Sequence, residues 1–381
     1  MQINLKMEEL FNLKVGYVNF KNPIAIATMA GITNSSFAKN HANAGLIVMG
    51  GYNLDKLTNI KAIELKKRGR EEFISNNPID FLKKELDAVK NLTTIAVNVR
   101  SVDDEILKEV AEIVKEKNAI LEIDAHCRQK EMTEIGVGEA LLHDIPRLCN
   151  LIKKIKKTGV VLSIKIRANV VDDITLAMEI EKAGADIIHV DAMLLGDNAD
   201  LDVIRCIRNA TNLFLIGNNS INSLTDAQNM FSRGSDMISV ARGVLKNPLL
   251  IDTLTKGIAK HNKDVGWYNP PKHICRGEGD TRGLAFCCLP VKHCALIPTI
   301  KDLGLTKEEY INLKKDFAKN TMLEYGGDTC FKSLVWCCKI SKPCFLRDGT
   351  LNAIGCTNKE YMKLKRELAE HILNNSKNPY L

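Results

Sequence analysis

No run of apolar residues in this 381-residue sequence approaches the length needed to cross a bilayer. The first residues, Met1-Gln2-Ile3-Asn4-Leu5-Lys6, also lack the charged start, apolar run and small-residue cleavage site of a secretory signal peptide. These absences exclude membrane-spanning and secreted classes and predict a cytoplasmic protein with no membrane partner. Disulfides are therefore not expected unless the source is a hyperthermophile, because they otherwise persist mainly in oxidising compartments.

Cysteine, in contrast, is abundant and unevenly distributed. Nine of the twelve cysteines lie in the last 107 residues, and eight of these form two groups that each contain the pattern CC-x5-C. The eight are Cys275, Cys287, Cys288 and Cys294, then Cys330, Cys337, Cys338 and Cys344. A similar helical phrase follows each group, Glu309–Lys314 and Glu360–Lys365. Four cysteines per group, used twice, predict two four-thiolate metal sites.

The cysteine spacing leaves the identity of the metal open. Neither group contains the CxxC pair that is usual in zinc sites, and adjacent cysteines do not match the compact ferredoxin pattern. We expect iron–sulfur clusters of the [4Fe–4S] type, with zinc as the alternative. Cys356 lies outside the repeat and is not expected to bind metal, whereas Cys149 and Cys206 are expected to pack within helices. Because the region has few aromatic residues, metal binding would supply much of its folding free energy.

The formal net charge of +7 is concentrated in the cysteine-rich tail. From Asn269 onward there are 18 Lys and Arg residues against 12 Asp and Glu residues. A four-thiolate iron–sulfur cluster is anionic, so we interpret the excess as compensation for cluster charge. A basic surface for RNA is the alternative interpretation.

Apolar segments of strand length alternate with amphipathic helical segments through the first two thirds of the chain. The strand-length segments are Ile24–Ala27, Leu46–Met49, Thr94–Val99, Ile120–Asp124, Val161–Ile166, Ile187–Asp191, Leu213–Gly217 and Met237–Val240. Continuous apolar strands that alternate with helices predict a parallel sheet covered on its outside. Eight such units in about 230 residues match an α/β fold of the (β/α)8 TIM-barrel type. A doubly wound sheet is the alternative.

A short hairpin over residues 12–25 is expected before the barrel, and a second domain after it. The segment Gly266-Trp267-Tyr268-Asn269-Pro270-Pro271 interrupts the helical periodicity, because two prolines fix the backbone and remove donors. We therefore predict a barrel over residues 1–265 and a small cysteine-rich, helical, metal-binding domain over residues 266–381. Helices are expected at residues 307–320 and 359–374 of this domain.

Polar residues follow most of the predicted strands. In a TIM barrel the functional groups lie at the C-terminal ends of the strands. The residues at these positions are Thr28–Gly31, Asn98, His126–Gln129, Lys165, Arg167, His189, Asn218, Asn219, Arg242 and Gly243. Small residues after the last two strands, including Gly217 and Gly243, indicate a phosphate site, which barrels commonly build from these loops.

Several barrel segments resemble the dihydrouridine synthase family of FMN barrels. They are Asn22–Asn34, Ser163–Arg167, and Asn219–Ser223 together with Ala241–Gly243. The end of the fourth strand, Ala125–Gln129, is similar to a distant archaeal branch of these barrels. The hairpin before the first strand also resembles that of dihydroorotate dehydrogenases.

The resemblance implies a bound FMN and a set of residues around it. Lys165 and His189 would face the flavin ring, Asn98 would contact its edge, and Met29 would lie beneath it. The phosphate would be held by Asn218, Ala241, Arg242 and Gly243. The chain departs from the family at Ala241, where the synthases have glycine.

Cys127 matches the position of the cysteine with which the synthases protonate the reduced base. With Lys165 and His189 it completes the expected catalytic set. We expect the neighbouring His126, Arg128 and Lys165 to lower the pKa of the Cys127 thiol. The family has Gly-Cys-Pro where this chain has His126-Cys127-Arg128.

The tail, from Gly279 to Cys344, resembles the methanogenesis marker nine domain of methanogenic archaea. Together the two resemblances imply a flavin-dependent oxidoreductase linked to methanogenesis, with electrons passing between iron–sulfur clusters and FMN. A small-molecule or protein redox partner is expected, a methanogenesis enzyme among the candidates, and nucleic acid is not. One alternative is a tRNA-dihydrouridine synthase-like enzyme whose basic tail holds RNA. The other is a non-catalytic scaffold with zinc-bound cysteines.

Overall fold

The computed structural model describes residues 11, 13–194, 198–211, 213–264, 284–285, 300–326, 332–337 and 345–378. The chain divides into two compact units, residues 14–255 and residues 1–13 with 256–381. The predicted domain boundary between residues 265 and 266 falls outside the described residues and stays a prediction.

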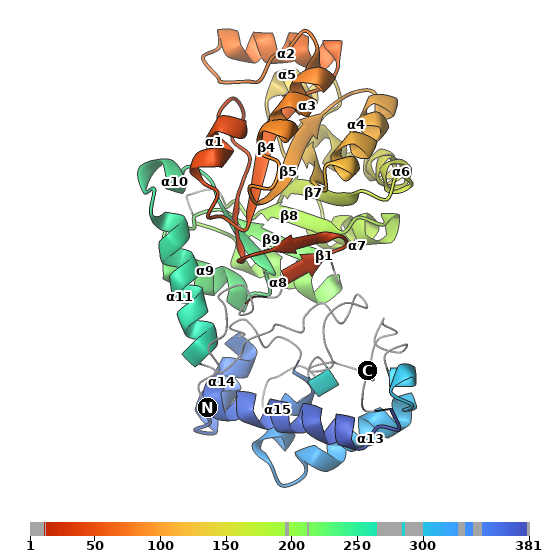
Figure 1. Cartoon of the computed structure of the whole chain (residues 1–381), viewed down its shortest axis with the longest axis vertical. Helices are drawn as coiled ribbons and strands as arrows, with labels where there is room; N and C mark the ends of the chain where they lie inside the picture. The colour runs from red at the N-terminus through yellow and green to blue at the C-terminus, as the bar shows by residue number, and fades with distance from the viewer. Residues whose placement is uncertain are drawn as a thin grey trace. The chain divides into compact units, whose positions relative to one another are not determined.

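Eight parallel strands of the first unit close into a barrel, each hydrogen-bonded to the next and β10 to β3 (Figure 1). They are β3 (Ile24–Ile26), β4 (Leu46–Asn53), β5 (Thr94–Arg100), β6 (Ile120–Ala125), β7 (Val161–Arg167), β8 (Ile187–Asp191), β9 (Phe214–Asn218) and β10 (Met237–Val240). The predicted (β/α)8 barrel is confirmed, and the doubly wound alternative is wrong. The largest difference is β4, which continues to Asn53 rather than ending at Met49.

Helices surround the strands of this barrel (Figure 1). Their bounds are α1 (Ser35–Asn40), α2 (Lys56–Lys67), α3 (Pro78–Ala88), α4 (Asp104–Glu116), α5 (Lys130–Thr133), the 3-10 helix η2 (Gly138–Leu142), α6 (Ile145–Lys156), α7 (Asp173–Ala183), α8 (Leu201–Ala210), α9 (Leu224–Ser232), α10 (Gly243–Lys246) and α11 (Leu250–Asp264). α4 shows why these segments are helical. Asp103 caps its first turn, and the buried Leu107, Val110 and Val114 recur at helical spacing.

The predicted hairpin, β1 (Leu13–Val15) and β2 (Val18–Phe20), packs against the N-terminal ends of the strands. Gly16 permits the tight turn because its φ is +53°. The Tyr17 hydroxyl donates to the carbonyl of Ala119 at 2.8 Å, just before β6, and accepts from the amide of Val161 at 3.2 Å. The hairpin therefore covers the end of the barrel opposite to the C-terminal strand ends.

The second unit is helical where it is described. Its elements are α13 (Lys307–Ala318), the 3-10 helices η5 (Met322–Glu324) and η7 (Leu334–Trp336), α14 (Phe345–Ala353) and α15 (Asn358–Asn374). α13 and α15 repeat one design, since a threonine capping box begins each helix at Thr306 and Thr357. A buried tyrosine and a buried lysine follow at matching positions, Tyr310 and Lys314 in α13 and Tyr361 and Lys365 in α15.

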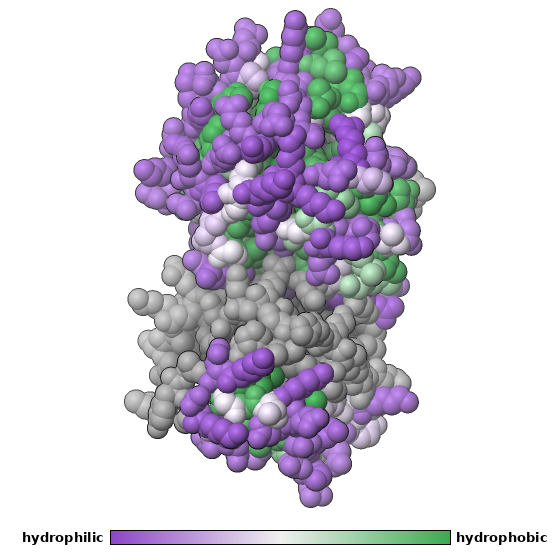
Figure 2. Space-filling view, turned by 90° about the vertical axis from the view of Figure 1, so that its right-hand side faces the viewer, coloured by the Kyte–Doolittle hydropathy of each residue, from purple (hydrophilic) through white to green (hydrophobic). Residues whose placement is uncertain are grey.

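The surface is mainly hydrophilic. Figure 2 shows one face on which hydrophobic residues form patches between hydrophilic ones. The exposed apolar residues include Leu57, Ile60 and Ile63, which lie on α2 at intervals of three. Among the described residues, no helix combines the length and the apolar character that a membrane crossing requires.

Candidate active site

Polar side chains recur at alternate positions of four neighbouring strands. They are Asn98 and Arg100 on β5, Glu122 and Asp124 on β6, Ser163, Lys165 and Arg167 on β7, and His189 and Asp191 on β8. Alternate residues of a strand share one face, and the register aligns Asp124, Lys165 and His189 across adjacent strands. The sequence analysis selected Asn98, Lys165 and His189 as rim residues, but they are 0–2% exposed and lie inside the barrel. The recurrence of polar residues at every second position of these strands was the sequence signal that could have identified the remaining inward-facing residues.

Glu122 is the centre of a buried hydrogen-bond network. Its Oε2 accepts from Ser163 Oγ at 2.9 Å and lies 2.8 Å from His189 Nδ1. Its Oε1 accepts from Asn98 Nδ2 at 2.9 Å. On the other side of the imidazole, His189 Nε2 is 2.7 Å from Ser239 Oγ. Four strands, β5, β6, β7 and β8, are thus joined through one carboxylate.

The network also sets the protonation states of its members. Burial alone would raise the pKa of Glu122, but interactions with His189, Lys165 and Asn98 outweigh burial and lower it to about 2. Burial and the charge of Lys165 lower the pKa of His189. Glu122 is therefore ionised at neutral pH, and a neutral His189 donates from Nδ1 to Glu122 and accepts at Nε2 from Ser239. Both ring nitrogens of His189 therefore contact protein atoms, and neither is left to contact flavin or transfer a proton in this arrangement. The flavin and proton-transfer roles implied for His189 stay predictions.

Lys165 differs from its neighbours in having no acceptor. Its side chain is only 2% exposed, and no hydrogen bond or ion pair joins its ammonium group to any residue that the structure describes. Two buried oxygens, Thr28 Oγ1 and Asn98 Oδ1, likewise have no hydrogen-bond partner within the described parts of the chain. A buried cation and unpaired polar atoms are costly unless a ligand satisfies them, so this arrangement fits a bound polar ring such as flavin.

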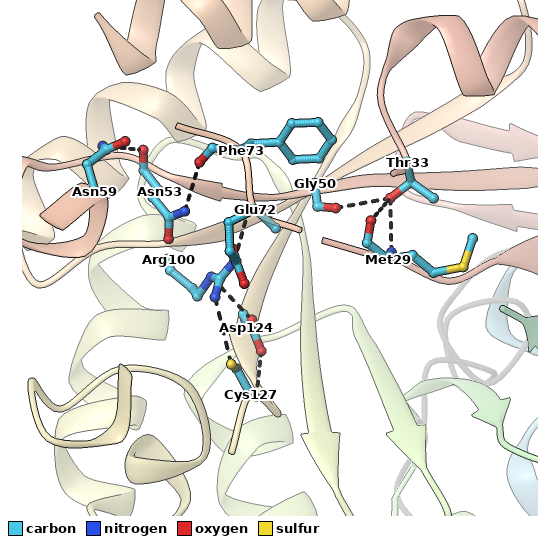
Figure 3. A network of polar contacts seen from close by, with 11 residues as sticks. Met29, Thr33, Gly50, Asn53, Asn59, Glu72, Phe73, Arg100, Asp124 and Cys127 are labelled. Atoms are coloured by element: carbon cyan, nitrogen blue, oxygen red, sulfur yellow. Dashed lines mark hydrogen bonds and ion pairs between the residues drawn. The ribbon is translucent and has the colours of Figure 1, made fainter. Parts of the chain in front are cut away.

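Met29, the residue implied beneath the ring, lies in a fixed turn after β3. Its amide donates to Thr33 Oγ1 at 3.0 Å, and the Thr33 hydroxyl also donates to the carbonyl of Gly50 at 3.0 Å (Figure 3). The turn is thereby attached to β4. Its implied contact with flavin stays a prediction.

The loops after β9 and β10 form the predicted phosphate region. Asn219 and Ser220 both adopt positive φ, 107° and 53°, a strained backbone that clusters at functional sites. The side-chain Nδ2 of Asn218 donates to the carbonyl of Ser239 at 2.9 Å, so it joins the ends of β9 and β10 from which the two loops leave. Arg242 is exposed and makes no ion pair with a described residue, and Ala241 and Gly243 flank it. Arg242 therefore has no described ion-pair partner, and its implied contact with the phosphate stays a prediction.

Gly217 has a different role from the one expected. An added Cβ would lie 2.5 Å from both Met230 Sδ and Ser235 Oγ. Its lack of a side chain therefore makes room for protein packing rather than for an anion. Gly243 is also close to protein atoms, since an added Cβ would lie 3.0 Å from Leu250 Cδ2.

Cys127 lies in a rigid loop directly after β6. Asp124 Oδ1 accepts from the amides of His126 at 3.0 Å and Cys127 at 2.9 Å. The carbonyl of Cys127 accepts from the amide of Glu139 at 2.9 Å. Burial raises the pKa of the thiol and outweighs the opposing effect of Arg100. The expected lowering of this pKa by His126, Arg128 and Lys165 is therefore wrong, because none of these is the cation beside the sulfur.

His126 instead pairs with the carboxylate of Asp191 at the end of β8. Its Nε2 lies 2.6 Å from Asp191 Oδ2, and Asn219 Nδ2 donates to the other oxygen of Asp191 at 3.0 Å. Burial opposes ionisation of Asp191, but the interactions with His126, Lys165 and Arg167 lower its pKa to about 2. Asp191 therefore connects the Cys127 loop to the phosphate region.

A basic segment lies next to the Cys127 loop. Lys66, Lys67, Arg68 and Arg70 are exposed. Arg68 Nη2 donates to Gln129 Oε1 at 2.9 Å, and Arg68 Nε lies 2.7 Å from Glu131 Oε1. The sequence analysis placed the positive excess in the tail and missed this cluster beside the barrel mouth.

The predicted metal sites lie almost entirely outside the described residues. Of the eight predicted ligands only Cys337 is described, and it is buried and not in a disulfide. No group of three or more His, Cys, Asp or Glu side chains in the described part of the chain is arranged to hold a metal ion.

The described residues before two cysteine pairs nevertheless meet at one lysine. Lys365 Nζ donates to the carbonyls of Ala285 and Val335, each at 2.9 Å, and each carbonyl lies two residues before a Cys-Cys pair. Lys314 Nζ lies 4.8 Å from the ring centre of Trp336, which precedes Cys337. The two halves of the repeat are therefore joined through buried cations.

Comparisons with known proteins agree with the barrel. Residues 58–276 match the family described as dihydrouridine synthase. An uncharacterized protein of Methanocaldococcus jannaschii is 33% identical over 254 residues, which cover 64% of this chain and 95% of that protein. Another from the same organism is 53% identical over 112 residues, 29% of this chain and 72% of that protein. The tRNA-dihydrouridine synthase B of Pasteurella multocida is 26% identical over 266 residues, 65% of this chain and 73% of that enzyme.

A solved structure with the same fold is DHODH of Eimeria tenella in complex with ferulenol. The TM-score is 0.54 at 12% sequence identity, and the match covers 70% of this chain and 88% of the other. At this identity the similarity shows the barrel fold alone.

Proposed function

This chain belongs to the dihydrouridine synthase family, and we propose that it reduces the uracil ring of an RNA substrate. Members of the family are FMN-dependent oxidoreductases, so the chain is an enzyme of that class. The tRNA-dihydrouridine synthase-like alternative from the sequence analysis thus becomes the leading proposal. The link to methanogenesis rests on the resemblance of the cysteine repeat and stays a prediction.

The residues of the barrel suit this chemistry. Reduction of uracil to dihydrouracil adds one hydride and one proton across a carbon–carbon double bond, and FMN, when bound, supplies the hydride. Cys127, partly buried in a hydrogen-bonded loop after β6, would supply the proton. Lys165, whose side chain is 2% exposed and has no acceptor among the described residues, would stabilise negative charge on the ring, and Arg242 would bind the phosphate.

The observation that carries the RNA proposal is the basic segment at the mouth. Lys66, Lys67 and Arg70 are exposed and make no ion pair with described residues. Arg68 ties the segment to the loop that carries Cys127. A polyanion bound here would therefore lie beside the proton donor, which suits an RNA whose base enters the barrel. This revises the earlier expectation that nucleic acid is not a partner.

The test is a reaction with RNA. The full chain, purified without oxygen, is given FMN, a reductant such as dithionite or a reduced nicotinamide, and an unmodified tRNA transcript. Mass spectrometry of the digested RNA should find uridines heavier by two hydrogen atoms. A protein that binds no FMN in excess cofactor, and leaves the RNA mass unchanged, would replace the enzyme proposal by the scaffold alternative.

Removing the Lys165 cation should weaken flavin binding and make the flavin harder to reduce. A charge-assisted contact contributes roughly 1.5–3 kcal/mol, which is about ten- to a hundredfold in affinity. Because the cation favours the reduced, anionic flavin most, Lys165→Met should lower the two-electron potential by about 30–60 mV. Fluorescence quenching and dye-coupled titration measure both quantities. The exposed Lys182→Met on α7 is the matched control, and equal values in both variants would exclude the contact.

The cysteine repeat adds a proposal about the electron supply. We propose that the repeat binds iron–sulfur clusters, with zinc as the alternative, and that its buried lysines support the anionic ligands. The observation in favour is that Lys365 binds the backbone before both Cys-Cys pairs. An iron–sulfur centre would exchange electrons with the flavin, whereas zinc would be structural.

Replacing a cysteine of the repeat should therefore remove metal. Cys337→Ser is expected to lower the iron or zinc content and to destabilise the tail, because metal binding supplies folding free energy. Cys356→Ser is the matched control, since Cys356 is also buried but lies outside the repeat. Elemental analysis and the visible spectrum of protein purified without oxygen decide the result. Unchanged metal content in Cys337→Ser would refute the assignment.

A further inference from the structure

A buried arginine lies directly beside the Cys127 thiol. Arg100 ends β5 and is only 3% exposed. Its Nη1 lies 3.7 Å from Cys127 Sγ (Figure 3). The guanidinium is therefore the cation in contact with the sulfur, although it lies 27 residues away in the sequence.

The guanidinium is held mainly through Nη2, which makes an ion pair and a hydrogen bond. Nη2 lies 2.6 Å from Glu72 Oε2 and donates to the carbonyl of Gly51 at 3.1 Å. Nε lies 3.6 Å from Asp124 Oδ2. A side chain at position 51 would meet the guanidinium, because an added Cβ would lie 2.8 Å from Nη2. The position of Arg100 is thus set by three separate elements, β4, β6 and the segment after α2.

The carboxylates around the Cys127 thiol outnumber the cations that contact it. One cation, Arg100, faces two carboxylates, Glu72 and Asp124, and the sulfur. When the thiol loses its proton the thiolate becomes a third anion beside the same guanidinium. Arg100 favours that state, and both carboxylates oppose it.

We propose that Arg100 is a positioning residue that holds the Cys127 sulfur at the barrel mouth and stabilises the thiolate left after Cys127 donates its proton. In that step the S–H bond breaks, the proton goes to carbon of the reduced base, and the electron pair stays on sulfur. Water then returns a proton to the thiolate. Glu72 limits this stabilisation, so that the thiol stays protonated until it reacts. The catalytic meaning rests on the proposed function, whereas the effect on the thiol does not.

The experiment measures alkylation of Cys127 by iodoacetamide as a function of pH in the full chain. Trypsin releases Cys127 in the segment 118–128, which holds no other cysteine, so mass spectrometry reads this thiol alone. Arg100→Gln should raise the midpoint of the alkylation profile by about one unit or more. Glu72→Gln should lower it, because the cation remains and an opposing anion is lost. The double variant should lie between the two.

These opposite signs separate an electrostatic role from a structural one. General loosening of the loop would expose the thiol in both variants and move both midpoints in the same direction, which would overturn the proposal. Unchanged midpoints would also overturn it. If Arg100→Gln does not fold, Glu72→Gln and the double variant, which leaves no unpaired Glu72 charge, still decide the question. If the midpoints move as expected but the wild type leaves RNA unreduced, the proposed function fails while this inference stands.

Discussion

A Cys127→Ala enzyme is expected to keep its fold and its flavin and to lose about a hundred- to ten-thousandfold in turnover, the range typical of a missing general acid. The side chain is small and lies in a loop that Asp124 holds through backbone amides, so its removal leaves that loop bonded. Single-turnover oxidation of the reduced flavin by RNA measures the effect, because it isolates the chemical step from flavin reduction.

The matched control is Cys206→Ala, which removes a partly exposed thiol from α8 and should leave turnover unchanged. Turnover of Cys127→Ala within a few-fold of the wild type would show that the proton comes from another group. His126 would then be the next candidate, because it lies in the same loop and pairs with Asp191.

Glu122→Ala is expected to destabilise the fold by about 3 kcal/mol or more, because each buried donor left without an acceptor costs roughly 1–3 kcal/mol. The change leaves the donors of His189, Asn98 and Ser163 without their acceptor inside the barrel. The midpoint of urea unfolding measures the loss. Glu105→Ala, at an exposed ion pair with Lys154, is the control and should leave the unfolding midpoint nearly unchanged, because solvent screens exposed pairs.

Glu122 should also make the free energy of unfolding depend on pH in the acid range. Its pKa in the folded protein is about 2, against an ordinary value of 4.5, so it contributes stability that is fully present above pH 4.5 and is lost as the pH falls toward 2. Glu122→Gln should therefore flatten the part of the curve between these values. Asp191, whose pKa is also about 2, is unchanged in this variant, so part of the dependence of the unfolding free energy on pH remains. A variant curve parallel to that of the wild type would contradict the assigned charge state.

The barrel could be read from the sequence because its signal is local. Segments such as Leu46–Met49 and Leu213–Gly217 are apolar, of strand length, and followed by helical patterns. In a parallel barrel each strand is buried on both faces, so the apolar run itself marks the strand. The strand ends were less certain, since β4 continues through Gly50 and Gly51, where no apolar side chain marks it.

The site was only partly predictable. Lys165 and Cys127 stood out because a charged or reactive residue at the end of an apolar strand is unusual. Glu122 was overlooked, although it lies two residues before Asp124 in an otherwise apolar strand and so shares its inward face. Reading the period of two within each strand would have identified it.

The sequence by itself therefore determined the strand and helix order, the barrel, the cysteine repeat, and the presence of Lys165 within one strand and of Cys127 directly after another. Only the tertiary structure decided which polar and charged side chains contact each other. His189 reaches Glu122 across 67 residues, and Arg100 reaches Glu72 across 28. The pKa of Cys127 was expected to be lowered by its sequence neighbours and is instead raised, because burial outweighs the lowering effect of Arg100, a cation from another strand. Periodicity is a property of neighbouring residues, whereas burial and electrostatic interaction depend on distances in space that folding alone sets.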